Sequence, residues 1–180
     1  MRIQAIAALV LLLLLASGVR AEVKEAGADH LLVTDSRVVH APPDKVYAAL
    51  VDVAHWWNSE HTYSGDATHL SIQAEAGGCF CERWGNQSVA HGRVIWAAPG
   101  QVLRLDTALG PLQSMAVQGV MTFTLKPEGH ATTLLFEYRV NGASSSGLDK
   151  LAPAVNGMLM EQLQRLQGFV ESGKVSARVQ

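Results

Sequence analysis

The sequence has few of the residues that binding to nucleic acid or to a membrane surface requires. Its 180 residues carry 14 Lys and Arg against 16 Asp and Glu, which gives a net charge of −2 with neutral histidines. The basic residues form no cluster, whereas phosphate backbones and anionic lipid surfaces are bound through basic patches. The composition therefore argues against nucleic acid and against an anionic membrane surface as partners.

Motifs of nucleophilic catalysis and of nucleotide binding are also missing. The sequence contains no nucleophile elbow, no phosphate-binding loop and no dinucleotide fingerprint. The serine run Ser144–Ser146 lies in the stretch 141–147, which is rich in small residues and indicates a flexible joint rather than a nucleophile. No internal repeat or low-complexity tract divides the chain. The lack of repeats favours a single domain. The missing motifs argue against the enzyme classes that those motifs mark.

The longest hydrophobic run, Ile3–Ala16, covers about 14 residues, which is short for the roughly 20 residues of a membrane-spanning helix. It follows a charged start and precedes Val19-Arg20-Ala21, so the first 21 residues resemble a cleavable signal peptide. An uncleaved anchor is the alternative, and the lack of a cysteine after the leucines argues against a lipoprotein. We expect cleavage after Ala21 and a periplasmic or secreted protein, with no membrane contact once the signal peptide is removed.

The remaining residues divide into a leader, one domain and a tail. Residues 22–30 are small and polar, and we expect a flexible leader there. Residues 31–172 carry the periodic patterns and have the length of one domain with its own core. Residues 173–180 are a C-terminal tail.

An amphipathic stretch near the C-terminus is the most regular pattern of the domain. From Leu148 to Val170, apolar residues recur every three or four positions, which predicts a helix of about 34 Å. Its buried face is expected to comprise Leu151, Val155, Leu159, Leu163 and Leu166. Strand-like segments cover residues 31–41, 70–75, 78–84, 88–96, 102–107, 115–125 and 132–140. Tight turns favour an antiparallel sheet, with two short helices after the first strand, so the fold class is α+β.

Several short motifs occur in a characteristic order along this domain. The first group is Val38–Ala41, Pro43–Tyr47 and Trp56-Trp57, and the second is Gly77–Glu82, His91–Val94 and Pro99 with Leu103. The first group resembles the opening of the SRPBCC (START-like, helix-grip) superfamily. The second is similar to the branch named for homologues of the activator of the heat-shock-protein-90 ATPase. The likeness covers residues 36–172.

The resemblance implies a helix-grip fold. In that fold, a curved antiparallel sheet of about seven strands wraps around the C-terminal helix, with a hydrophobic cavity between them. The superfamily includes lipid carriers and polyketide cyclases, so the fold leaves the activity open. Activation of an ATP-driven cytosolic chaperone is disfavoured, because the sequence predicts export.

Cys79 and Cys81 are the only cysteines, and residues two apart on a strand point to the same face. Three interpretations are open. The thiols are two small side chains on a sheet face, or they form a strained disulfide across a Cα separation of about 6.6 Å, or they bind a metal with His91 as third ligand. Because two sulfurs alone do not make a zinc site, we expect no metal and no cofactor.

Glu82 is the first candidate for acid–base chemistry. It shares a strand face with Phe80 and Trp84, and burial among aromatic side chains would raise the pKa of its carboxyl. His91 is a candidate assistant in the same cavity. The alternatives are a surface glutamate or one paired with an arginine across the sheet.

Aromatic residues and methionines supply candidates for the lining of the cavity. Each of these residue types is also ordinary core. The expected ligand-binding residues are Trp56, Trp57, Phe80, Glu82, Trp84, Leu103, Met121, Phe123, Phe136, Tyr138 and Met158.

These patterns together favour an exported protein that binds a small hydrophobic molecule between sheet and helix. The first alternative is a cyclase-like or hydrolase-like enzyme that uses Glu82 and His91 in the same cavity. The second is a metal-responsive or redox-responsive protein centred on Cys79 and Cys81.

Overall fold

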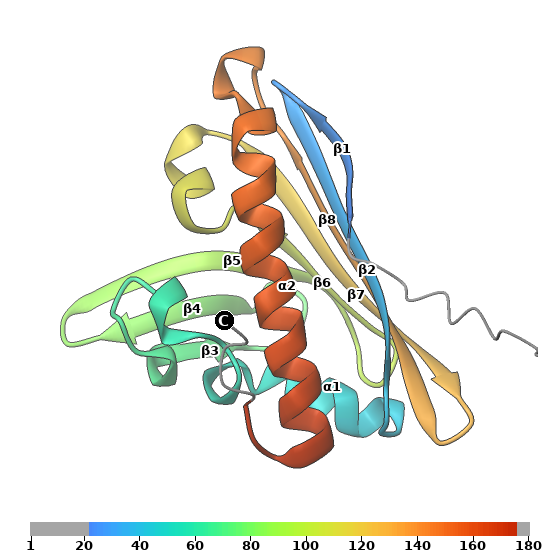
Figure 1. Cartoon of the computed structure of the whole chain (residues 1–180). Coiled ribbons are helices and arrows are strands. Elements are labelled where there is room, and N and C mark those ends of the chain that lie inside the picture. Colours follow the sequence, from blue (N-terminus) through green and yellow to red (C-terminus); the bar gives the residue numbers. More distant parts are fainter. Residues whose placement is uncertain (1–21, 176–180) are drawn as a thin grey trace, which may run out of the picture.

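The computed structural model describes residues 22–175 as an eight-stranded antiparallel sheet and a long C-terminal helix, α2 (Leu148–Ser172) (Figure 1). A shorter helix, α1 (Pro43–Val51), follows the second strand. The strands are β1 (Glu22–Gly27), β2 (His30–Val39), β3 (Leu70–Ile72), β4 (Cys79–Trp84), β5 (Gln87–Ala98), β6 (Val102–Thr107), β7 (Gln118–Glu128) and β8 (Ala131–Asn141). Short 3₁₀ turns occupy several connections: η1 (Val53–His55), η2 (Ser59–His61), η3 (Ala67–His69), η4 (Gly110–Met115) and η5 (Ser144–Ser146).

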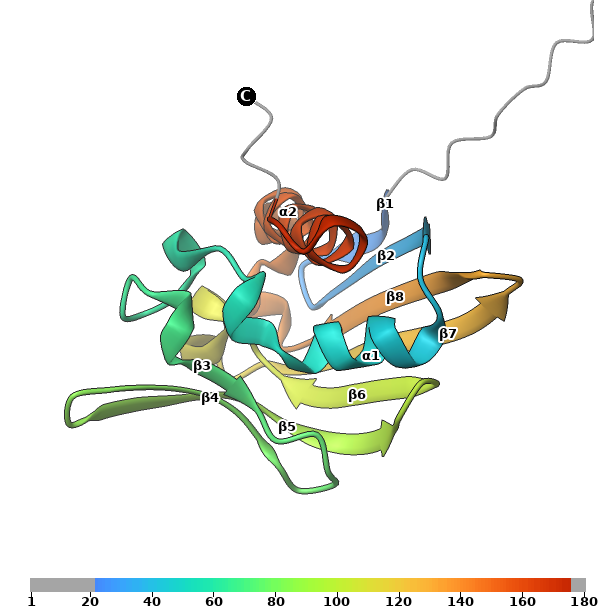
Figure 2. The same cartoon turned by 90° about the horizontal axis from the view of Figure 1, so that it is seen from below.

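The order of the strands brings the two ends of the domain together. From edge to edge the order is β1-β2-β8-β7-β6-β5-β4-β3, and neighbouring strands are antiparallel. β2 pairs with β8 along its whole length, from His30 opposite Asn141 to Val39 opposite Thr132. The sheet curves, and α2 lies along its concave face (Figure 2).

α2 directs its leucine-rich face toward the sheet. Leu159, Leu163 and Leu166 are each at most 2% exposed, and Val155 is also buried. Leu151 is only half-buried, because it borders the cavity described below. The predicted fold class, α+β with a curved antiparallel sheet and a long C-terminal helix, is confirmed.

The segment expected to be a flexible leader is instead the edge strand β1. Its residues pair with β2, with Val23 opposite Val33, and Val23 packs against the core. An edge strand can be held largely by backbone hydrogen bonds on one side, so its composition need not be apolar. β1 raises the strand number from the expected seven to eight.

Between β2 and β3 the chain forms the short helix α1, which agrees with the short helices expected after the first strand, and then short 3₁₀ helices. Beyond Val51 the chain continues through the turns η1, η2 and η3. Trp56 Nε1 donates to the carbonyl oxygen of Ala49 at 2.9 Å, and Trp57 Nε1 donates to that of His61 at 3.0 Å. These indole hydrogen bonds fix an irregular path, and the loop that results covers part of the cavity.

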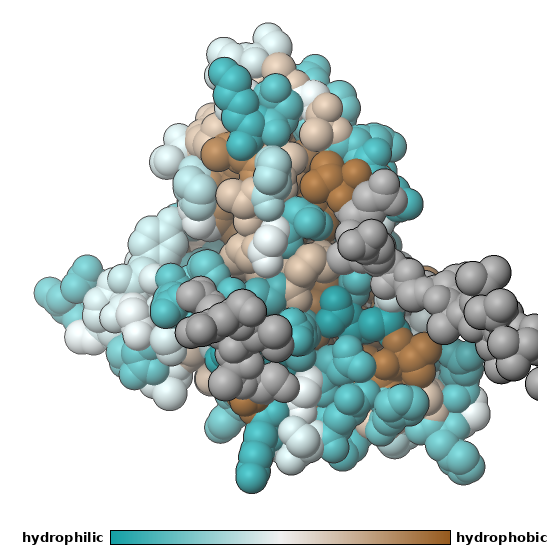
Figure 3. Space-filling model, in the orientation of Figure 1, coloured by the Kyte–Doolittle hydropathy of each residue, from teal (hydrophilic) through white to brown (hydrophobic). Residues whose placement is uncertain are grey.

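The surface on the α2 side is mostly hydrophilic, with hydrophobic side chains in separate patches (Figure 3). Within residues 22–175, no helix has both the length and the apolar character needed to cross a membrane.

Candidate functional site

A β-bulge brings His91 to the inner face of the sheet. In the β4–β5 ladder, Phe80 is opposite Gly92 and Cys81 is opposite Ala90, so His91 is an extra residue on β5. An extra residue interrupts the alternation of inward and outward side chains. His91 is only 6% exposed, and the centroid of its ring lies 5.0 Å from that of Phe80.

Gly92 accommodates this bulge, because its neighbours leave no room for a side chain. A Cβ at this position would lie 2.7 Å from the Cβ of Thr107 and 2.8 Å from the carbonyl oxygen of Asp106. Thr107 also fixes the bulged backbone, since its Oγ1 donates to the carbonyl oxygen of His91 at 2.6 Å.

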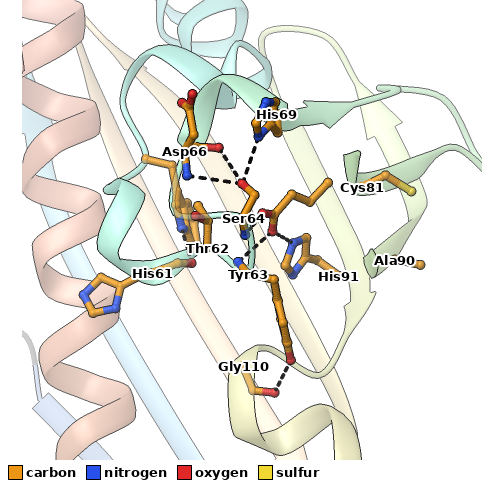
Figure 4. A network of polar contacts seen from close by, with 12 residues as sticks. His61, Thr62, Tyr63, Ser64, Asp66, His69, Cys81, Ala90, His91 and Gly110 are labelled. Atoms are coloured by element: carbon orange, nitrogen blue, oxygen red, sulfur yellow. Dashed lines mark hydrogen bonds and ion pairs between the residues drawn. The ribbon is translucent and has the colours of Figure 1, made fainter. Parts of the chain in front are cut away.

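Glu82 is fully buried and accepts hydrogen bonds from two parts of the chain. Its donor residues Tyr63, Ser64 and His91 lie close together in Figure 4. Its Oε2 accepts from the backbone N–H of Tyr63 and from Nε2 of His91, each at 3.0 Å. Its Oε1 accepts from the backbone N–H of Ser64 at 2.5 Å. Glu82 therefore joins the loop between η2 and η3 to the sheet, and it is neither a surface residue nor the partner of an arginine.

The surroundings of Glu82 and His91 determine which of them carries charge. Burial raises the pKa of Glu82, but the hydrogen bonds that it accepts outweigh burial, and its pKa lies below the ordinary value of 4.5. Burial lowers the pKa of His91 from 6.5, and its contact with Glu82 opposes this only in part. Glu82 is therefore ionised and His91 neutral at pH 7. The sequence-based argument predicted a raised pKa for Glu82, because it considered burial without these donors.

This charge state fixes the tautomer of His91. An ionised carboxylate can only accept hydrogen bonds, so His91 Nε2 carries the proton that Glu82 receives. Nδ1 of the neutral ring then keeps its lone pair. His91 is a hydrogen-bond acceptor, and Glu82 is the group that orients it.

A cavity of about 560 Å³ lies between α2, the β4–β5 region and the loops beside them. Most of its lining is apolar: Trp57, Leu70, Phe80, Leu109, Pro111, Leu112, Leu151, Ala154, Val155 and Met158. The polar lining consists of Glu60, His61, Thr62, Tyr63 and His91. Predominantly apolar pockets with a few polar groups are typical of small-molecule sites.

Loop-to-loop and loop-to-helix hydrogen bonds hold the walls of this cavity. The Tyr63 hydroxyl donates to the carbonyl oxygen of Gly110 at 3.1 Å, which joins the η2–η3 loop to η4. The backbone N–H of Asn58 donates to Oε1 of Gln162 at 2.8 Å, and its Nδ2 donates to Oε1 of Glu161 at 2.5 Å. The second set ties the loop to α2.

The structure brings some of the predicted site residues together. Trp57, Phe80 and Met158 line the cavity with His91. Glu82 hydrogen-bonds His91 but is not itself part of the lining. The two candidate acid–base residues are thus adjacent, and His91 is the one that borders the cavity.

The other predicted lining residues lie outside the cavity. Trp84 is half-buried at the end of β4. Tyr138 belongs to the backbone framework: its hydroxyl donates to the carbonyl oxygen of Thr107 and accepts from the N–H of Leu109, and burial raises its pKa. The rest fill the packed core: Trp56, Leu103, Met121, Phe123 and Phe136.

Sequence reasoning missed the lining residues that loops contribute. Leu109 and Leu112 flank the Gly110-Pro111 turn, and Tyr63 comes from the loop after η2. Loop residues show no hydrophobic period, so the turn signal of Gly110-Pro111 was the only local indication. The position of the loops over the cavity depends on contacts with distant elements.

Cys79 and Cys81 form a disulfide. Their Cα atoms are 5.4 Å apart, closer than the expected 6.6 Å and within the usual range for disulfides. The register shift of the β4–β5 ladder falls between Phe80 and Cys81, so the regular strand geometry assumed in that expectation does not apply here. The structure therefore agrees with the second of the three interpretations of these cysteines, the disulfide.

Among residues 22–175, no group of three or more His, Cys, Asp or Glu side chains is arranged to hold a metal ion.

No protein-family model matches the sequence, and no curated protein matches it. Solved structures do match. EF2215 from Enterococcus faecalis, described as a conserved protein of unknown function, has a TM-score of 0.58 and 14% identity over 88% of this chain and 80% of its own.

Two further structures carry names that describe more. The Aha1 dimer from Colwellia psychrerythraea has a TM-score of 0.58 and 18% identity, over 79% of this chain and 98% of that chain. CalU16 from Micromonospora echinospora has a TM-score of 0.53 and 19% identity, over 82% of this chain and 78% of that chain. Identities this low show the fold alone, and the chain has the helix-grip fold.

Proposed function

We propose that this protein binds a small hydrophobic molecule in the cavity beside α2. The observation that carries the proposal is the 560 Å³ cavity with its largely apolar lining. This volume lies within the range of pockets that enclose small organic ligands. On this proposal the protein is an SRPBCC-superfamily binding protein, in the branch that its motifs and its likeness to the Aha1 structure favour.

The polar lining indicates the chemistry of the ligand. His91 is neutral, and its Nε2–H is already donated to Glu82. The remaining ring nitrogen accepts, so a hydroxyl or N–H group on an otherwise apolar ligand would complement it. An anionic group would lie close to the Glu82 carboxylate and is disfavoured. We therefore propose a neutral, mostly hydrophobic ligand with one hydrogen-bond donor.

Binding of N-phenyl-1-naphthylamine, a neutral apolar amine with one N–H donor, tests this proposal. We expect its fluorescence to rise on binding to the wild-type protein. Leu151→Trp places a larger side chain at the cavity wall and should weaken binding by about tenfold or more, roughly 1.4 kcal/mol. Gln164→Trp is the matched control, because Gln164 is exposed on the same helix and outside the lining.

Equal binding by both tryptophan variants would contradict the proposed site. If the probe binds as expected, native mass spectrometry of protein purified from its own compartment should identify the natural ligand. The Leu151→Trp variant should carry less of that ligand than the wild-type protein. Empty wild-type protein that also fails to bind the probe would favour a protein-interaction module.

The Glu82–His91 pair supports a second candidate function, an enzyme in the same cavity. A neutral histidine oriented by a carboxylate is suited to act as a general base. The roles are the reverse of the sequence-based hypothesis, in which Glu82 was the acid or base and His91 its assistant. Hydrolysis of p-nitrophenyl butyrate tests the hydrolase form: activity that His91→Gln abolishes, with probe binding retained, would favour it over a pure binding protein.

We also propose that the protein is exported and cleaved after Ala21. The signal-peptide residues lie outside the described part of the chain, and the proposed cleavage site directly precedes β1. N-terminal sequencing should find Glu22 as the first residue of the extracytoplasmic protein. A soluble cytosolic form that retains Met1 would contradict this.

A further inference from the structure

The disulfide on β4 lies beside a second hollow of the molecule. Cys79 borders a groove of about 500 Å³ formed by β5, β6 and the start of β7, whereas Cys81 is outside it and only 4% exposed. Cys79 is half-buried and therefore partly accessible. We propose that this pair is a thiol–disulfide exchange site, in which Cys79 reacts with an external thiol and Cys81 is the resolving sulfur.

The position of the disulfide makes it a poor structural staple. It closes a loop with only Phe80 between its two cysteines, and so short a loop removes little conformational entropy from the unfolded chain. The strand is already held on both sides, because Cys81 is paired with Ser71 of β3 and Cys79 with Arg93 of β5. A bond that adds little to the fold can be broken and re-formed without unfolding the protein.

The surroundings of Cys79 favour its thiolate. Arg93 is directly opposite Cys79 on the neighbouring strand, is exposed and lines the same groove. A guanidinium close to a cysteine stabilises the reactive, deprotonated sulfur. Asp106 of β6 lies opposite Arg93 in the β5–β6 ladder and also lines the groove. Its negative charge therefore offsets part of the positive charge of Arg93. Cys81 has no arginine opposite it; its β5 partner is Ala90.

The exchange proceeds in two substitutions at sulfur. The thiolate of an external thiol attacks Sγ of Cys79: a mixed disulfide forms, the Cys79–Cys81 bond breaks, and its electron pair leaves on Cys81, which then takes a proton. A second thiolate attacks the external sulfur of the mixed disulfide, releases the oxidised small molecule and leaves Cys79 as a thiolate. Two thiols are oxidised to one disulfide while the protein pair is reduced, and the reverse sequence re-oxidises it.

Equilibration of the folded protein with glutathione tests the site. Mixtures of reduced and oxidised glutathione are applied, free thiols are alkylated, and the fraction of protein with two alkyl groups is read by mass spectrometry. We expect this fraction to change reversibly with the glutathione ratio while the circular dichroism of the native protein is retained. A pair that stays oxidised at every ratio until the protein is unfolded would be a structural disulfide, and the proposal would be overturned.

Single-cysteine variants test the assigned roles. With oxidised glutathione, Cys81→Ser should acquire one glutathione on Cys79, about tenfold or more faster than Cys79→Ser acquires it on buried Cys81, because access and thiolate fraction set the rate. Arg93→Gln in the Cys81→Ser background should slow the reaction. Should a variant fold poorly, peptide mapping of reduced wild-type protein after brief alkylation answers the same question. Equal modification of both cysteines would overturn the assignment.

Discussion

His91 and Glu82 share a hydrogen bond of 3.0 Å between Nε2 and Oε2, and both side chains are buried. The bond connects the cavity wall to the interior of the sheet, because His91 lines the cavity and Glu82 does not. It fixes one ring nitrogen of His91 as the donor to Glu82. A buried pair that titrates in this way also makes the stability of the protein depend on pH.

We expect the free energy of unfolding to fall as the pH is lowered through two windows. The folded-state pKa of His91 lies below its ordinary value of 6.5, so the unfolded state binds more protons. Protonation of His91 therefore favours the unfolded state. Its contribution to the free energy of unfolding is complete above pH 6.5 and is lost as the pH falls below 6.5. The folded-state pKa of Glu82 lies below 4.5, so its contribution is lost as the pH falls below 4.5. Urea-unfolding midpoints across both windows measure the effect.

His91→Gln is the control for this pH dependence. The variant should lose the first window and retain the second, because Glu82 keeps its hydrogen bonds from the loop backbone. An unchanged dependence on pH around 6.5 would show that another group is responsible.

Truncation of the α2 leucines should separate the packed core from the cavity. Leu159→Ala and Leu163→Ala should each lower the free energy of unfolding by about 2–5 kcal/mol, because both side chains are 2% exposed and packed. Leu151→Ala should cost less, since Leu151 is half-buried and already borders a cavity. Chemical denaturation measures all three, and equal losses would contradict the placement of the cavity.

Two glycine-to-alanine changes should have opposite effects. Gly92→Ala should destabilise the protein by about 1–3 kcal/mol, because the added Cβ would overlap Thr107 at the bulge. Gly157→Ala should stabilise it by about 0.5–1 kcal/mol, because Gly157 is an exposed helical residue with open space around its Cβ position. Thermal unfolding of both variants provides the comparison. Destabilisation by Gly157→Ala would indicate that a ligand or a partner needs this space.

Removal of the Tyr63 hydroxyl should loosen one wall of the cavity. Tyr63→Phe keeps the ring but loses the hydrogen bond to Gly110. Tyr63 is 50% exposed, so we expect a loss of stability of less than about 1 kcal/mol with faster release of N-phenyl-1-naphthylamine. Stopped-flow dissociation measures the release. An unchanged rate would show that η4 holds its position without this bond.

The sequence by itself determined the elements whose patterns are periodic. The three-and-four spacing from Leu148 to Val170 predicted α2, and the strand segments between turn residues predicted the antiparallel sheet, because burial of one face imposes these periods. The alternation of side chains along a strand also placed Phe80 and Glu82 on one face of β4. β1 was missed, since its composition shows no apolar alternation and its pairing with β2 holds it in the sheet.

Only the tertiary structure decided which of the inward-facing residues surround a cavity. Phe123 and Phe136 are phenylalanines at inward-facing strand positions, as Phe80 is. Their ring centroids lie 5.1 Å apart in the packed core, whereas Phe80 borders the cavity. The inward position of His91 depends on a one-residue bulge, and the ionised state of Glu82 depends on N–H groups from a loop about 20 residues earlier in the chain. The strand period predicts neither, because the bulge shifts that period by one residue and the N–H groups come from a separate loop.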